Sequence, residues 1–201
     1  MSENLRIRVV TTSPDLAAEL IPLSSKHFSF AGEPFNIELH GKLLHEWCNK
    51  PYSAKFWNMR GSYEELLTYY TNQIENGNSE FMVVTINNEP SAFAECYPII
   101  GSELEQHIAE ATEKDFGFHF LMAPPKELAK KYPKDKKTVQ RLVVLNTLGY
   151  YFTLLDASNI YGEPDVENTK AIKLATKLGF HIEKDIKLTD KTASLIRFSK
   201  E

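Results

Sequence analysis

Two β-rich runs that follow each other closely are the feature that most constrains how this chain can fold. Residues Phe81–Ile86 and Ser91–Ile99 favour strands, and the polar turn Asn87–Pro90 (NNEP) between them predicts a hairpin. A third run, Phe116–Met122, follows, and beyond it helical and strand patterns alternate. Strands in succession that lead into alternating helices and strands predict a mixed α/β sheet.

Helices are predicted on both sides of the hairpin. Before it, Ser62 and Glu65 have the spacing of a capping box, and apolar residues at helical spacing continue to a helix end near Gly77. After it, Thr138–Leu155 and Val166–Leu178 read as helices, the second closed by a glycine. The other expected elements are a strand at Leu5–Val10, a loop at Phe28–Phe35 that carries Gly32 and Pro34, a helix at Ile37–Cys48, and strands at Asn159–Gly162, Phe180–Lys187 and Ala193–Ser199.

Composition narrows the class of protein. The chain has 201 residues, 42% of them hydrophobic, which suits a single domain spanning residues 1–201. A net charge of -4 gives no reason to expect binding to nucleic acid or an anionic membrane. No apolar stretch is long enough for a membrane span or a secretory signal, so we expect a cytoplasmic protein. Monomer and homodimer both stay open.

The two cysteines do not indicate chemistry. Cys48 and Cys96 have neither a CxxC partner nor metal-ligand spacing. We expect both to be reduced packing residues, with a structural disulfide or a nucleophile as the alternatives. No metal site is predicted.

The segment 166–180, VENTKAIKLATKLGF, carries a family resemblance. Its apolar residues form one stripe of an amphipathic helix that begins beside Asn168. The segment resembles the last conserved stretch of the GCN5-related N-acetyltransferase (GNAT) superfamily, whose pattern is Asn, two residues, Ala, then Leu-Tyr and a terminal Gly-Phe. Ala175 occupies the slot of the tyrosine that commonly protonates the leaving thiolate in that superfamily. The proton donor is therefore unassigned.

Further matches, in order along the chain, resemble the siderophore-biosynthesis branch of that superfamily. LHEWCNKPYSAKFW (44–57) resembles its entry segment, SAFAECY and DFGFHFLM resemble two of its strands, and EPDVEN supplies Asp165. The resemblance implies a GNAT fold, a mostly antiparallel mixed sheet flanked by helices. It implies an acyl-CoA-dependent N-acyltransferase with acetyl-CoA, or another acyl-CoA, as cosubstrate. The acceptor it implies is a small-molecule amine or hydroxylamine, a lysine- or diamine-derived precursor of a hydroxamate iron chelator.

The resemblance also assigns residues to roles. It implies that His119 and Asp165 act at the reacting centre. Candidate substrate-binding residues are His45, Trp47, Trp57, Glu95, Tyr97 and Asp115. Candidate cofactor-binding residues are Phe120, Leu121, Met122, Lys134, Lys136, Lys137, Thr138, Val139 and Asn168.

The alternation of DFGFHFLM agrees with a functional His119. Period 2 places Phe116, Phe118 and Phe120 on one face of the strand and His119 on the other, beside the small Gly117. Histidine suits a general base because its ordinary pKa lies near neutrality. The alternative is a strand histidine bonded to a backbone carbonyl.

Each remaining candidate has a structural alternative. Asp165 stands where a helix N-cap is expected, and a capping carboxylate could still orient an amine or the imidazole. Trp47 and Trp57 could line a pocket for an aliphatic stem, but aromatic residues at helical spacing are more often core. Glu95 shares a strand face with Tyr97 and could pair with a cationic amine, or be simply exposed.

The coenzyme loop departs from the superfamily pattern. The usual glycine-rich turn that holds pyrophosphate is missing, since no glycine lies between Ala123 and Thr138. The stretch from Pro124 to Lys137 is Lys-rich instead. The phosphates could be held by these lysines and by helix N–H groups near Thr138 and Val139. The alternative is a solvated charged loop.

The predicted reaction is direct transfer in a ternary complex. A neutral nitrogen attacks the thioester carbonyl, His119 takes or relays its proton, and a strand N–H near His119 polarises the carbonyl oxygen. One alternative is another acceptor, namely a polyamine, an aminoglycoside or a peptide amine. The second is a degenerate domain that binds without turnover.

Overall fold

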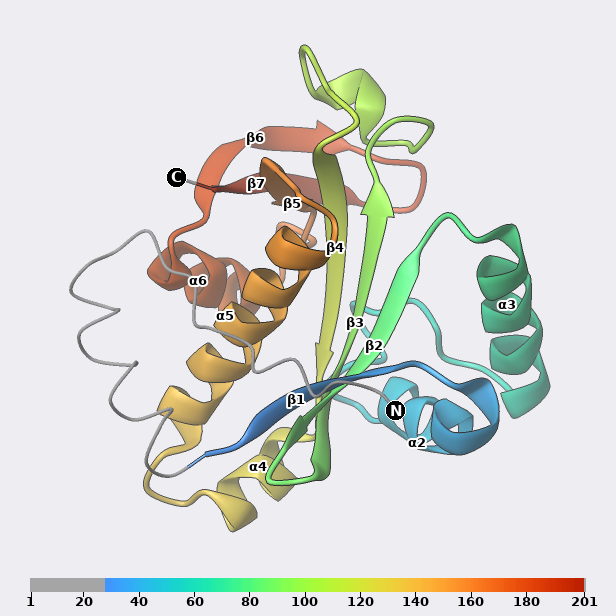
Figure 1. Cartoon of the computed structure of the whole chain (residues 1–201), viewed down its shortest axis with the longest axis vertical. Helices are drawn as coiled ribbons and strands as arrows, with labels where there is room; N and C mark the ends of the chain where they lie inside the picture. The colour runs from blue at the N-terminus through green and yellow to red at the C-terminus, as the bar shows by residue number, and fades with distance from the viewer. Residues whose placement is uncertain (1–27, 201) are drawn as a thin grey trace.

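The computed structural model describes residues 28–200 and contains one seven-stranded sheet of order β1-β2-β3-β4-β5-β7-β6 (Figure 1). All neighbouring strands are antiparallel except β4 and β5, which are parallel. The predicted mixed, mostly antiparallel sheet is therefore confirmed. The predicted strand at Leu5–Val10 lies outside the described residues. The strands are β1 (Phe30–Pro34), β2 (Glu80–Ile86), β3 (Glu89–Pro98), β4 (Asp115–Met122), β5 (Asn159–Gly162), β6 (His181–Lys187) and β7 (Thr192–Ser199).

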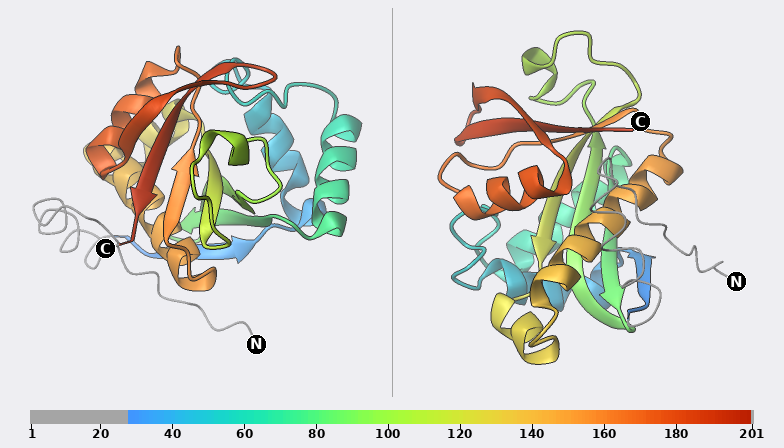
Figure 2. Two further views of the ribbon diagram at one scale, coloured as in Figure 1. Left: turned by 90° about the horizontal axis from the view of Figure 1, so that it is seen from above. Right: turned by 90° about the vertical axis from the view of Figure 1, so that its left-hand side faces the viewer.

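Helices cover both faces of the sheet (Figure 2). On one face, Val84 and Ala94 of the hairpin pack in a cluster with Leu145 of the long helix α5. On the other face, Val83 and Phe93 pack in a second cluster with residues of α2 and α3. Strand alternation thus supplies both cores. The helices are α2 (Ile37–Cys48), α3 (Tyr63–Asn76), α4 (Pro125–Lys131), α5 (Lys136–Leu154) and α6 (Thr169–Leu178), with a 3-10 turn η1 (Glu105–His107).

Local sequence patterns predicted the ends of most helices and strands to within two residues of their observed positions. The capping box at the start of α3 is present, because Ser62 accepts from the Glu65 N–H and Glu65 accepts from the Ser62 N–H. Gly77 closes the same helix in the left-handed conformation. In the hairpin, Asn87 and Asn88 have φ values of 52° and 65°. They form the whole turn, so β3 begins at Glu89 rather than at the predicted Ser91.

The predicted loop at Phe28–Phe35 was wrong, because residues 30–34 form strand β1. Gly32 and Pro34 suggested a loop, but β1 lies at the edge of the sheet and pairs antiparallel with β2 alone. An edge strand tolerates proline because its outer N–H groups need no partner in the sheet. Phe30 also packs against the α5-side core, which favours the extended conformation.

The Lys-rich stretch was also read incorrectly as a continuous loop. Its first half forms α4, which begins at Pro125 and has Lys130 and Lys131 in its last turn. Lysines there interact favourably with the helix dipole, so no bound anion is needed to explain them. Leu128, 2% exposed, anchors α4 in the core beside α2 and α3.

Helix α6 begins three residues later than expected. Its N-cap is Asn168, whose side chain accepts from the Ala171 N–H at 3.3 Å. Asp165 instead forms an isolated antiparallel bridge with Ala193 just after β5. This long-range pairing keeps the segment extended, so Asp165 is not the helix cap that the sequence suggested.

Candidate active site

A large cavity opens where β4 and β5 diverge. The two strands pair only over Asp115–Gly117 of β4, although β4 continues for five more residues. The cavity measures about 1540 Å³ and extends from Lys136 of α5, past β4, to a polar cluster near the end of β5. A space of this size and shape can hold an elongated donor and a small acceptor together.

The polar cluster is assembled by strand register. On β3 and β4, Glu95 lies directly opposite His119, and Tyr97 lies opposite Gly117. Phe118 packs in the core on the α5 side, whereas His119 faces Trp57 with ring centroids 6.3 Å apart. The predicted alternation of this strand is therefore confirmed.

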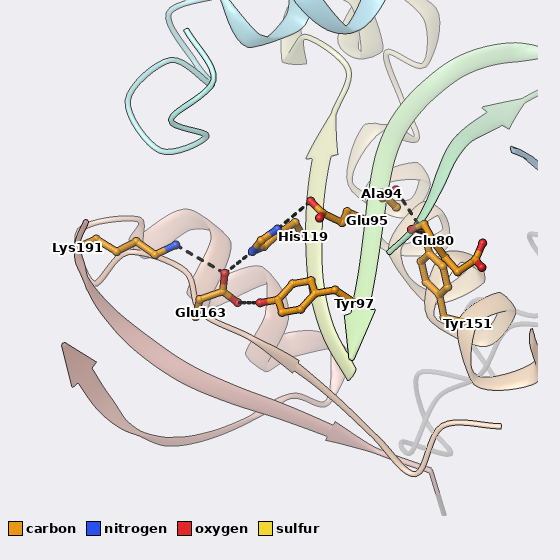
Figure 3. A network of polar contacts seen from close by, with 8 residues as sticks. All are labelled: Glu80, Ala94, Glu95, Tyr97, His119, Tyr151, Glu163 and Lys191. Carbon is orange, nitrogen blue, oxygen red and sulfur yellow. Dashed lines mark hydrogen bonds and ion pairs between the residues drawn. The ribbon is translucent and has the colours of Figure 1, made fainter. Parts of the chain in front are cut away.

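His119 lies between two glutamates (Figure 3). Its Nδ1 is 3.1 Å from Glu95 Oε2, and its Nε2 is in closer contact with Glu163 Oε1. The glutamate side chains are only 9% and 5% exposed. A neutral imidazole has one N–H, but an imidazolium donates from both nitrogens. The geometry therefore fits a charged His119 between two carboxylates.

Electrostatics support the charged form. Burial lowers the pKa of His119, but the charge of Glu163, its hydrogen bond and the contact with Glu95 outweigh burial and raise the pKa to about 10. Burial raises the pKa of Glu163, whereas the His119 charge and hydrogen bond, with Lys191, bring it below its ordinary value. The raised pKa favours an imidazolium at neutral pH, and the general-base role of His119 stays a prediction.

Tyr97 completes the cluster, and Gly117 makes room for it. The Tyr97 hydroxyl donates to Glu163 Oε2 at 3.4 Å, and its ring centroid is 5.0 Å from that of His119. Burial, together with the charges of Glu163 and Glu95, raises the pKa of Tyr97, which keeps the phenol protonated. Any side chain at position 117 would overlap the tyrosine ring.

Glu163 was missed in the sequence. It follows directly after β5, at the point where β4 and β5 separate, and belongs to the same EPD turn as Asp165. Asp165 lines the cavity, but its carboxylate accepts from the Glu167 N–H at 2.7 Å. The partner of the imidazole is therefore Glu163 and not Asp165. The sequence did contain a signal for Glu163, because this carboxylate follows the strand predicted at Asn159–Gly162 and begins the EPDVEN segment.

The other predicted substrate residues divide into two groups. Trp57, Glu95 and Tyr97 line the cavity. Trp47, 3% exposed, belongs to the core, so the alternative reading of this aromatic was correct. His45 contacts the Gly61 carbonyl, and Asp115 is buried and accepts from Asn159 and Thr112. These three residues lie outside the cavity lining because local packing and capping use their side chains.

The predicted coenzyme residues divide in the same way. The cavity is lined by Phe120, Leu121, Met122, Lys136 and Asn168, and also by Ala175 at the slot of the expected tyrosine. Val139 is fully buried in the core, and Lys134, Lys137 and Thr138 are not among the lining residues. The phosphate site formed by the whole lysine run stays a prediction. Lys136, at the first turn of α5, is the lysine of that run placed to meet an anion.

Within residues 28–200, no three His, Cys, Asp or Glu side chains are grouped so that they could hold a metal ion. None of the helices described there has the length and apolar character to cross a membrane.

Comparisons with known proteins give the fold and the family. An uncharacterized protein from Bacillus halodurans has a similar structure, with a TM-score of 0.72 and 22% identity over 86% of this chain and 84% of that one. The aminoglycoside acetyltransferase AAC(6')-Ib in complex with coenzyme A gives 0.68 and 20% identity over 86% and 95%. The spermidine N-acetyltransferase from Vibrio cholerae in complex with CoA and spermine gives 0.61 and 19% identity over 85% and 95%.

A curated relative from Schizosaccharomyces pombe (strain 972), named "Putative lysine N-acyltransferase C17G9.06c", is 30% identical over 111 residues. The match covers 55% of this chain but only 33% of that relative, so the matched region spans about a third of the length of the relative. Residues 36–188 match the model of the acetyltransferase (GNAT) domain, which is more than half of the chain. The chain therefore belongs to the GNAT acetyltransferase domain family.

Proposed function

We propose that this protein transfers an acyl group from acyl-CoA to the hydroxylamino or amino nitrogen of a lysine- or diamine-derived hydroxamate precursor. The observation that carries the proposal is the cluster in which His119 lies between Glu95 and Glu163 at the cavity wall. A lysine-type acceptor is supported by the order of the motif matches along residues 44–180 and by the name of the S. pombe relative, "Putative lysine N-acyltransferase C17G9.06c".

If His119 is protonated, the residue that accepts the proton of the nucleophile must be a different one. His119 then cannot accept a proton until it has lost one, so it holds the two carboxylates in place instead. Glu163 is charged and lines the cavity, which makes it the group that receives the proton from the acceptor nitrogen. A hydroxylamino nitrogen is neutral at pH 7. It therefore needs no deprotonation before attack, and a weakly basic carboxylate is sufficient afterwards.

The overall exchange balances without a covalent enzyme intermediate. The acceptor nitrogen forms a bond to the acyl carbon, the carbon–sulfur bond breaks, and the nitrogen loses one proton while the thiolate gains one. Acetyl-CoA supplies the activated acyl group. Residues of the chain orient the acceptor: Trp57 and Tyr97 enclose the cavity beside His119, where they can contact the methylenes of the acceptor.

The test follows thiol release from acetyl-CoA with N6-hydroxylysine and with a hydroxylated diamine. We expect Glu163→Gln to lower kcat by about 100-fold or more, the usual contribution of an acid–base group. His119→Ala should also lower kcat, because Glu95 and Glu163 lose the imidazole that lies between them. Glu183→Gln is the matched control, because this carboxylate lies on β6 outside the cavity lining and pairs with Arg197. No release with any hydroxylamino acceptor, or undiminished release in both site variants, would refute the proposal.

Polyamines, aminoglycosides and peptide amines form the comparison set in the same assay. The spermidine N-acetyltransferase from V. cholerae was solved with CoA and spermine, and AAC(6')-Ib with coenzyme A; both share the fold of this chain. If these acceptors are turned over faster than hydroxylamines, the proposed acceptor is wrong, but the proposed acyl transfer from acyl-CoA still holds.

A further inference from the structure

The turn between β6 and β7 brings a lysine into the active site. The turn is closed by the Leu188 N–H, which donates to the Lys191 carbonyl at 2.9 Å. The Lys191 side chain is 21% exposed and lines the cavity, and its Nζ lies 3.7 Å from Glu163 Oε1. Figure 3 shows it approaching Glu163 beside His119. No role in the sequence motif accounts for this lysine.

The turn is fixed by contacts from a distant segment. Glu103, in the connection between β3 and β4, accepts from both the N–H and the hydroxyl of Thr189 at 2.7 Å. Leu104 and Leu188 are buried in the same apolar cluster. The turn that carries Lys191 is therefore packed against the β3–β4 connection, and the Lys191 side chain is largely buried at the cavity.

Within the ion-paired cluster of Glu95, His119 and Glu163, the charges balance when Lys191 is counted and His119 is protonated. The carboxylates of Glu95 and Glu163 face two cations, His119 and Lys191. We infer that Lys191 is a specificity-determining residue, which compensates the second carboxylate so that the site favours a neutral acceptor nitrogen over an alkylammonium. The inference rests on the proposed function, and it narrows the acceptor class of the same site.

The physical reason is the cost of adding a third cation. A lysine-type amine has an ordinary pKa of about 10.4 and arrives protonated at pH 7. It would then meet His119 and Lys191 as like charges within a partly buried cavity, where screening by water is reduced. A hydroxylamino nitrogen is neutral and escapes this repulsion. Without the Lys191 charge, the cluster would have an excess carboxylate and would attract the ammonium.

The experiment compares kcat/KM for N6-hydroxylysine with kcat/KM for lysine, with acetyl-CoA as donor. For Lys191→Met, we expect the preference for the hydroxylamine to fall by about tenfold or more. Lys191→Arg keeps the charge and should retain the preference. Lys187→Met is the matched control on the same hairpin, because Lys187 is exposed and outside the cavity lining.

The outcomes separate the inference from the proposed function. If the wild type releases thiol with no hydroxylamine, the proposed function fails. If the wild type prefers the hydroxylamine and Lys191→Met lowers both rates equally, only the inference is overturned, because Lys191 then acts through structure alone. Thermal unfolding and acetyl-CoA calorimetry check each variant, and Lys191→Gln repeats the measurement if the Met variant does not fold.

Discussion

Gly117→Ala tests the packing of the candidate site directly. A Cβ at position 117 would lie 2.6 Å from the Tyr97 hydroxyl oxygen and closer still to two carbons of its ring. The φ of Gly117 is not positive, so alanine meets no backbone strain there. Tyr97 must therefore leave its position and lose both its contact with His119 and its hydrogen bond to Glu163. Overpacking costs ~1–3 kcal/mol and a lost hydrogen bond ~1 kcal/mol.

The expected destabilisation is thus about 2–4 kcal/mol, or a fall of roughly 4–16 °C in Tm for a chain of this size. Urea unfolding of the wild type, Gly117→Ala, Tyr97→Ala and the double variant tests whether the clash with the Tyr97 ring causes the destabilisation. Once the ring is gone, Gly117→Ala should cost nothing or stabilise by ~0.5 kcal/mol, because alanine suits a strand better than glycine. Gly162→Ala is the control, since its Cβ would lie 3.2 and 3.3 Å from two side-chain carbons of Ile196 and 3.9 Å from the Phe118 carbonyl oxygen. An equal cost of Gly117→Ala in both backgrounds would refute the reasoning.

Three further predictions concern charge. The pKa of His119 in the folded protein, about 10, lies above its ordinary value of 6.5. The contribution of His119 to stability is therefore complete below pH 6.5 and is lost as the pH rises through about 10. In urea unfolding, the stability advantage of the wild type over His119→Gln should shrink across that pH range. Glu163→Gln should lower the pKa of His119, as followed by NMR titration of its imidazole, and an unchanged pKa would contradict the pairing. Lys136→Ala should weaken acetyl-CoA binding about tenfold in calorimetry, whereas Lys134→Ala should not, and equal losses would support the idea of a lysine-rich phosphate loop.

Patterns confined to one element were predictable from the sequence. The capping box at Ser62 and Glu65 depends on residues three apart. The alternation of β4 placed His119 on the face opposite Phe118. In each case neighbours along the chain determine the geometry.

Features that depend on distant pairing were not predictable in this way. The bridge between Asp165 and Ala193 decides which carboxylate of the EPD turn meets the imidazole, and it selects Glu163. Burial of Trp47 depends on how α2 packs against the sheet. The charge of His119 likewise follows from two carboxylates that come from β3 and from the end of β5, so its ordinary pKa was a poor guide.

The central claim is that an acyl-CoA-dependent transferase here acylates a neutral hydroxylamino nitrogen at the cluster of His119, Glu95 and Glu163. The most direct measurement is to quantify thiol release and acyl hydroxamate formation in one reaction with acetyl-CoA and N6-hydroxylysine. We predict one hydroxamate for each thiol released, with both products lost together in Glu163→Gln. Thiol release without hydroxamate, or no release by protein that binds acetyl-CoA, would contradict the claim.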